Sequence, residues 1–143
     1  MAKNAAVVYP LLPEHIERIF NGKDVFCKYV GGKRVNINIG NKLIFYQSSS
    51  GKYLVGEAII DWIGYMPPDA IMEEFGDRLF ITPDELDKYR GNRSESEKLL
   101  VLVLSNIRRY EKPLKPPKTV TMAGCMLSRD QYRRLMRNLS SLP

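Results

Sequence analysis

The chain has 143 residues, of which 44% are hydrophobic, and its formal net charge at pH 7 is +6. A chain of this size and composition can bury its own core, so we expect one domain over residues 1–143 that needs no disulfide or structural metal. The longest apolar run, residues 99–104, is too short to span a membrane, and the N-terminus lacks a signal-peptide pattern. These features predict a cytoplasmic protein.

A short helix followed by a strand is predicted near the N-terminus. Pro13 at a first-turn position, apolar residues at helical spacing and Gly22 as a stop predict a helix over residues 13–21. Residues 24–30 are rich in strand-forming residues and run into the turn Gly31-Gly32, which predicts a strand. We expect the apolar stripe of the helix to face the core.

Two further strands are predicted on either side of a serine-rich loop. They cover residues 42–47 and 53–65, and the loop between them has the composition of a hairpin connection. Gly56 lies inside the longer strand, where it indicates a bulge or a close approach to the backbone by another segment. Trp62, on the same strand, is expected to pack in the core.

Two short helices are predicted in the middle of the chain. Apolar residues at helical spacing before Gly76 predict one or two helical turns. The run Thr82-Pro83-Asp84-Glu85 combines a capping box with proline at the first helical position. It predicts a helix that ends near Tyr89.

The C-terminal part is predicted to contain two strands and a helix. Residues 99–104 begin a buried strand, and residues 119–127 form the last strand. The proline-rich residues 112–118 connect the two in an extended conformation. Ser128 and Gln131 form a second capping box, which opens a helix. The apolar side of this helix is expected to consist of Tyr132, Leu135, Met136 and Leu139.

The order of these elements indicates the fold class. About five strands and several short helices follow one another without regular alternation, which argues against a doubly wound parallel sheet. The predicted class is α+β. Its expected form is a small, mixed, partly closed β pseudo-barrel with short helices in the connections and a C-terminal helix.

Charge is unevenly distributed along the chain. Residues 23–52 contain six basic residues and one acid, residues 57–87 contain nine acids and one base, and residues 105–143 contain nine bases and two acids. If the fold brings the two basic segments together, they form a positive surface suited to a polyanion. The alternative is ordinary solvated surface.

Three parts of the sequence together resemble a known family. They are LPEHIERIFNGK at residues 12–23, a following strand that carries Lys28, and Gly56-Glu57-Ala58 in a long strand. They resemble the ASCH family of the PUA-like superfamily, and the whole chain most resembles an uncharacterised archaeal family of that fold. The resemblance implies a pseudo-barrel with a cleft beside the first helix and strand, proposed to bind RNA or nucleotides. In one branch of the family, the domain removes acyl groups from a modified cytidine nucleoside.

The family motif can be compared with this chain residue by residue. Lys23 and Lys28 match its two basic positions, but Phe26 stands where a threonine or glutamate is expected. In the hydrolase branch that polar residue acts with a lysine and a glutamate, and Glu57 is the candidate for the glutamate here. The phenylalanine therefore weakens the hydrolase interpretation. Lys23 and Glu57 are the only candidate catalytic residues.

Basic and aromatic residues are the candidates for contacts with a ligand or RNA. Basic side chains contact phosphates, and an exposed aromatic ring can stack on a base. Lys33 and Arg34 after the double glycine fit either an anion-binding turn or a plain hairpin turn. The predicted binding residues are Lys23, Lys28, Lys33, Arg34, Tyr46, Lys52, Tyr53, Arg133 and Arg137.

Metal, cofactor and disulfide chemistry is not expected. The single histidine, His15, excludes a site built from several histidines, and we expect it on the surface of the first helix. Cys27 and Cys125 both lie in predicted strands, where free core cysteines are more common than ligands or disulfides.

Three hypotheses for function follow. The first is an RNA-binding or nucleotide-binding domain with a basic cleft beside the first helix and strand. The second is an amidohydrolase that acts on an acylated nucleoside. The third is a protein-interaction domain whose basic and acidic segments pair between subunits, as a homodimer rather than a monomer.

Overall fold

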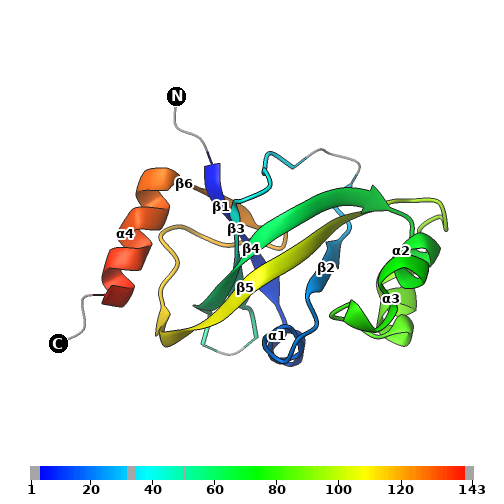
Figure 1. Ribbon diagram of the computed structural model, residues 1–143, viewed down its shortest axis with the longest axis horizontal. Helices are drawn as coiled ribbons and strands as arrows, with labels where there is room; N and C mark the ends of the chain where they lie inside the picture. Colours follow the sequence, from blue (N-terminus) through cyan, green and yellow to red (C-terminus); the bar gives the residue numbers. More distant parts are fainter. Residues whose placement is uncertain (1–3, 32–34, 50, 141–143) are drawn as a thin grey trace.

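The computed structural model describes residues 4–31, 35–49 and 51–140. Six of its strands form one sheet with the order β2-β5-β4-β3-β1-β6 (Figure 1). The strands are β1 (Asn4–Leu11), β2 (Val25–Lys28), β3 (Lys42–Gln47), β4 (Tyr53–Met66), β5 (Leu99–Leu114) and β6 (Cys125–Ser128). The helices are α1 (Pro13–Phe20), α2 (Pro68–Phe75), α3 (Pro83–Arg90) and α4 (Arg129–Ser140), with a 3₁₀ turn η1 (Gly76–Arg78) after α2.

The mixed α+β class predicted from the sequence is confirmed. β1 pairs with β3 in parallel, and every other neighbouring pair of strands in this sheet is antiparallel. The sheet is curved, but its hydrogen bonding does not close into a barrel, because β2 and β6 are left as edge strands. Among the described residues, no helix is long and apolar enough to cross a membrane.

β1 is the strand that the sequence analysis missed. It lies between β3 and β6, and its residues Ala6, Val7, Val8 and Tyr9 are at most 1% exposed. A strand covered on both faces has a continuous apolar run without alternation, so it lacks the period-two signal of a half-buried strand. β5 extends to Leu114, into the predicted connection, and β6 is shorter than the strand predicted over residues 119–127.

The sheet separates two apolar cores. The first core lies among the sheet, α1, α2 and α3, and includes Val7, Tyr9, Ile16, Ile19, Phe26, Phe45 and Leu102. The second core lies beneath α4 and consists of Ala6, Val8, Ile44, Leu54, Tyr110, Leu114, Leu127 and Leu135. Figure 1 shows α4 at the opposite end of the molecule from α2 and α3. The predicted inward side of α4 is confirmed, since Tyr132, Met136 and Leu139 pack against the second core.

Both predicted capping boxes are present. The Glu85 amide donates to Thr82 Oγ1 at 3.1 Å, and the Thr82 amide donates to Glu85 Oε1 at 2.8 Å. At α4, the Gln131 amide donates to Ser128 Oγ at 3.2 Å and the Ser128 amide donates to Gln131 Oε1 at 2.8 Å. Each box satisfies two amides that the first helical turn leaves without partners, so the starts of α3 and α4 are fixed locally.

Trp62 is not in the core, contrary to the prediction. Its side chain is 42% exposed, and the pairing between β4 and β5 shifts register between Ile60 and Trp62. Ile60 pairs with Leu104 and Trp62 with Val103, so β4 has one more residue than β5 at this point. A bulge of this kind reverses which positions face the core. The indole therefore points outward although Ile60, two residues earlier, is buried.

Gly56 is a place of close backbone approach, as predicted. An ideal Cβ at this position lies 2.6 Å from the carbonyl oxygen of Arg108 and 2.6 Å from the ring of Phe20. The Phe20 ring also lies under the guanidinium of Arg109, at 4.2 Å from its centroid. The end of α1 is thus held against β4 and β5 because residue 56 has no side chain.

We predict that Gly56→Ala lowers the free energy of unfolding by about 1 to 3 kcal/mol, since the added methyl group overpacks this contact. Urea denaturation measures the change, and an unaltered m-value shows that the unfolded state is the same. An unchanged urea midpoint would contradict the close contact of Phe20 with β4.

Candidate functional site

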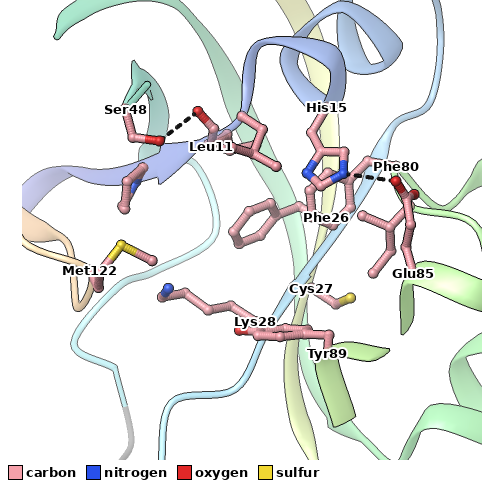
Figure 2. A pocket seen from close by; sticks show the side chains of 13 residues that line it. Leu11, His15, Phe26, Cys27, Lys28, Ser48, Phe80, Glu85, Tyr89 and Met122 are labelled. Carbon is pink, nitrogen blue, oxygen red and sulfur yellow. Dashed lines mark hydrogen bonds and ion pairs between the residues drawn. The ribbon is translucent and has the colours of Figure 1, made fainter. Parts of the chain in front are cut away.

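A cavity of about 280 Å³ opens beside α1 and β2, where the family resemblance places a cleft. The end of β1, the start of α1, β2 and the segment that leads into α3 supply most of its lining (Figure 2). Its lining residues are Pro10, Leu11, Leu12, His15, Phe26, Cys27, Lys28, Ser48, Phe80, Ile81, Glu85, Tyr89 and Met122.

Aromatic rings form much of the cavity wall. The ring centroids of Phe26 and Phe80 are 5.1 Å apart, and Tyr9 stacks behind Phe26 at 5.5 Å with an interplanar angle of 13°. Tyr89 adds a further ring, and its hydroxyl is fixed because it accepts a hydrogen bond from the Tyr29 amide at 3.0 Å. Packed rings of this kind form a rigid apolar surface on which a flat ligand can lie.

The α1 side of the cavity is polar and charged. His15 Nε2 lies 3.3 Å from Glu85 Oε2, and both guanidinium NH groups of Arg18 donate to the same carboxylate. The Arg18 hydrogen bond, together with the Thr82 amide and His15, lowers the pKa of Glu85 from 4.5 to about 2. Glu85 is therefore ionised at neutral pH, and it links α3 to α1 at one edge of the cavity.

Lys28 is the one lysine or arginine in the cavity lining. Figure 2 shows its side chain reaching into the cavity between Met122 and Tyr89, and its Nζ is 5.3 Å from the centroid of the Tyr9 ring. Burial lowers the pKa of the Lys28 ammonium. Among residues 4–31, 35–49 and 51–140, no carboxylate forms an ion pair with it. Lys28 thus offers a cation to a ligand.

Lys23, the other basic residue of the family motif, does not line the cavity. Its Nζ donates to the carbonyl oxygen of Asp77 at 2.5 Å, and the neighbouring Asp24 pairs with Arg78 at 2.9 Å. Lys23 therefore links the end of α1 to η1.

Glu57 is buried beneath α4 rather than in the cavity. It is 3% exposed, and it accepts hydrogen bonds from the hydroxyls of Tyr110 at 2.8 Å and Tyr132 at 2.8 and 2.9 Å. Lys42 Nζ lies 3.9 Å and Arg108 Nε 3.7 Å from its Oε2. Burial and the nearby carboxylate raise the pKa of both tyrosines, so both hydroxyls stay protonated as donors. Neither Glu57 nor Lys23 lines the cavity, so the candidate catalytic pair is not assembled there.

The two basic segments of the sequence do meet in the structure. Lys42 on β3 belongs to the first segment and Arg108 on β5 to the second, and both flank Glu57 on β4. Arg133 and Arg137, with Tyr132 and Met136, line a shallow hollow on α4.

Tyr46, Lys52 and Tyr53 do not line the cavity. Tyr46 packs against the second core, Tyr53 is 37% exposed, and Lys52 precedes it in the loop before β4. Lys33 and Arg34 lie outside the described residues.

Sequence reasoning missed the polar side of the cavity. His15, expected on the helix surface, has a side chain that is only 17% exposed and contacts the Phe80 ring at 5.4 Å. Glu85 was predicted only as a helix cap. No local pattern joins a histidine on α1 to a carboxylate seventy residues later, because their contact depends on how α1 and α3 pack.

Cys27 is buried in the first core, as expected, whereas Cys125 is only partly buried against the second core. Cys27 and Cys125 are both free, and burial raises the pKa of the Cys27 thiol to about 12. Cys27 therefore lines the cavity as a neutral thiol and not as a nucleophile.

The sequence matches one family model and one curated protein. A family model described as a domain of unknown function (DUF365) matches residues 4–129. An uncharacterised protein of Methanocaldococcus jannaschii is 29% identical over 107 residues, which are 68% of this chain and 99% of that protein.

Solved structures show the same fold at low sequence identity. The crystal structure of ASCH from Zymomonas mobilis aligns with a TM-score of 0.77 at 16% identity, over 93% of this chain and 94% of that chain. The N-terminal domain of Staphylothermus marinus McrB aligns with a TM-score of 0.52 at 19% identity, over 96% of this chain and 84% of that chain. The predicted resemblance to ASCH domains is confirmed at the level of fold.

We predict that Tyr132→Phe lowers the free energy of unfolding by about 1.5 to 3 kcal/mol, because it removes hydrogen bonds to a buried carboxylate. Tyr110→Phe is expected to cost a similar amount. In the double variant the two effects are not expected to add, since both hydroxyls serve the same carboxylate. Urea denaturation of the three variants measures this coupling, and simple additivity would argue against a shared network.

We predict that Glu85→Gln costs about 1 kcal/mol of stability at pH 7, because it loses the ion pair with Arg18 but keeps an oxygen for the capping box. The pKa of Glu85 is lower in the folded chain, so the pair stabilises fully above about pH 4.5 and this contribution is lost as the pH falls towards 2. Thermal unfolding of both proteins across this range is the measurement. A gap that stays constant with pH would contradict the prediction.

Proposed function

We propose that this chain, which belongs to the DUF365 family of domains of unknown function, binds RNA. It holds one unpaired base, or a nucleotide-like ligand, in the cavity beside α1 and β2. The observation that carries the proposal is Lys28, a half-buried cation without an ion-pair partner among the described residues, in a cavity walled by aromatic rings.

The cavity matches the chemistry of a base in three respects. Its volume, about 280 Å³, suits a small ligand such as a single base or nucleoside. Phe26, Phe80 and Tyr89 offer apolar surface for a flat ring, and single-stranded RNA is commonly read by stacking of splayed bases on aromatic side chains. His15 and Glu85 offer hydrogen-bonding groups to a base edge on the α1 side.

Lys28 supplies the electrostatic part of the binding. A cation in the lining suits either the phosphate next to the bound base or a carbonyl oxygen of the base itself. The net charge of +6 favours association with a polyanion before the cavity is filled. In this proposal the general charge supplies affinity that depends on salt, and the cavity supplies the preference for an unpaired base.

The shared fold is consistent with this proposal but does not carry it. The structural neighbours are below 25% identical to this chain, so their likeness concerns the backbone alone. A hydrolase of acylated nucleosides has less support, because Lys23 contacts η1 and Glu57 is hydrogen-bonded to Tyr110 beneath α4.

We predict that Lys28→Ala weakens binding of a fluorescein-labelled single-stranded RNA by about tenfold, since it removes a charged contact from the cavity. Fluorescence anisotropy across a salt series is the measurement, with an RNA hairpin of equal length alongside. Lys23→Ala is the matched control, because it removes the same charge from a position outside the cavity.

The two lysine variants distinguish the possible outcomes. A loss confined to Lys28→Ala, with a preference for the single strand over the hairpin, supports a base in the cavity. Equal, small losses in both variants would indicate general charge only. RNA binding that is weak and indifferent to both lysines would overturn the proposal, and a nucleoside amidohydrolase assay would be the next experiment.

A further inference from the structure

A second hollow, of about 570 Å³, lies where the end of β4 and the start of β5 meet α2. It shares no lining residue with the cavity beside α1. Its surface is mainly aromatic and apolar, with one carboxylate. The side chains that form it are Trp62, Tyr65, Met66, Glu74, Phe75 and Val103.

The indole of Trp62 is held in place although it is exposed. Its ring centroid is 6.1 Å from that of Phe75. The indole also lies against Gly64, where an ideal Cβ would be 2.1 Å from the ring. The absence of a side chain at residue 64 therefore lets the indole lie against the strand. The Tyr65 hydroxyl is fixed as well, since it accepts a hydrogen bond from the Val35 amide at 3.2 Å.

The surroundings of this hollow are acidic. Glu74 lines it and Glu73 precedes Glu74 on the same exposed stretch of α2. Within the part of the chain that the structure describes, neither glutamate forms an ion pair. The one base among residues 57–87 is Arg78, and it is already paired with Asp24. Among the described residues, therefore, no ion pair neutralises Glu73 or Glu74.

An aromatic surface with free carboxylates selects for cations. A positively charged group gains energy over the face of an indole, and a nearby carboxylate adds a direct ion pair. The chain itself shows this chemistry at the same place, because the Arg78 guanidinium lies 5.7 Å from the Phe75 ring centroid and pairs with Asp24. A nucleic acid fits poorly, since the α2 carboxylates repel its phosphates.

We propose that this hollow is a docking site for a lysine or arginine side chain of a partner polypeptide. The cation lies over the Trp62 ring and pairs with Glu74, and the aliphatic part of the side chain packs against Met66 and Val103. This protein-binding surface is separate from the RNA-binding cavity, so the chain can hold an RNA at one site and a basic protein segment at the other.

Trp62 makes the proposal directly testable, because it is the only tryptophan of the chain. We expect a capped hexa-arginine peptide to change the tryptophan fluorescence saturably, and a capped hexa-glutamine peptide to leave it unchanged. With a labelled hexa-arginine peptide, Trp62→Leu and Glu74→Lys are each expected to weaken binding by about fivefold.

Glu111→Lys is the matched control for charge. It makes the same change of sign at an exposed residue of β5 that lies far from the hollow along the strand. The hollow is at Val103, which pairs with Trp62, whereas Glu111 lies beyond Arg109, which pairs with Gly56. Circular dichroism melting confirms that each variant is folded. Lys28→Ala is expected to leave peptide binding unchanged, so failure of the RNA proposal and failure of this one can be told apart.

Three results would overturn the inference. The first is the absence of a saturable fluorescence change with hexa-arginine. The second is an equal loss of binding in Glu111→Lys and Glu74→Lys, which would indicate attraction to the whole acidic surface. The third is a fluorescence change with single-stranded RNA that becomes stronger in Glu74→Lys, which would make the hollow a nucleic-acid surface instead.

Discussion

The irregular pairing of β4 with β5 is the constraint on which much of the structure depends. These are the two longest strands, and their register shifts at three points along the ladder. Gly56 at one of these points admits the Phe20 ring and so fixes the end of α1. Glu57 turns to the α4 side, and after the last shift Trp62 turns outward. The position of Glu57 beneath α4 and the exposure of Trp62 thus both follow from which way β4 presents its side chains.

The cavity is held open by contacts between elements that are far apart in sequence. The Glu85 carboxylate contacts Arg18 and His15 of α1, and its Oε1 also accepts a hydrogen bond from the Thr82 amide at the start of α3. One carboxylate therefore starts a helix, joins two helices and forms part of the polar side of the cavity. Because these roles share one group, a change at Glu85 affects the start of α3, its link to α1 and the polar edge of the cavity together.

The charged side chains differ between the cavity, the region beneath α4 and the surface around Trp62. Lys28 stands without an ion-pair partner among the described residues in the cavity, whereas Lys42 and Arg108 flank the buried Glu57 beneath α4. The carboxylates of α2 lie by a third surface, around Trp62. Under the two proposals above, a polyanion and a basic polypeptide would therefore bind at different places on one small domain.

Local sequence determined the features that depend on hydrogen bonds within a few residues. The capping boxes at Thr82 and Ser128 were predictable for this reason. The bounds of β3 followed from its composition, and the glycine at residue 56 indicated a bulge or a close approach without identifying the partners, Phe20 and Arg108. The resemblance to ASCH domains led us to expect a cleft beside α1 and β2, where the cavity lies. Tertiary structure alone decided that β1 is a buried strand between β3 and β6, that Trp62 faces outward and that Lys28, rather than Lys23, enters the cavity. It also brought His15 to Glu85 and hid Glu57 beneath α4. The physical reason is that caps and turns are satisfied by neighbours in sequence, whereas a bulge, a buried strand or a contact between helices is fixed by partners dozens of residues away.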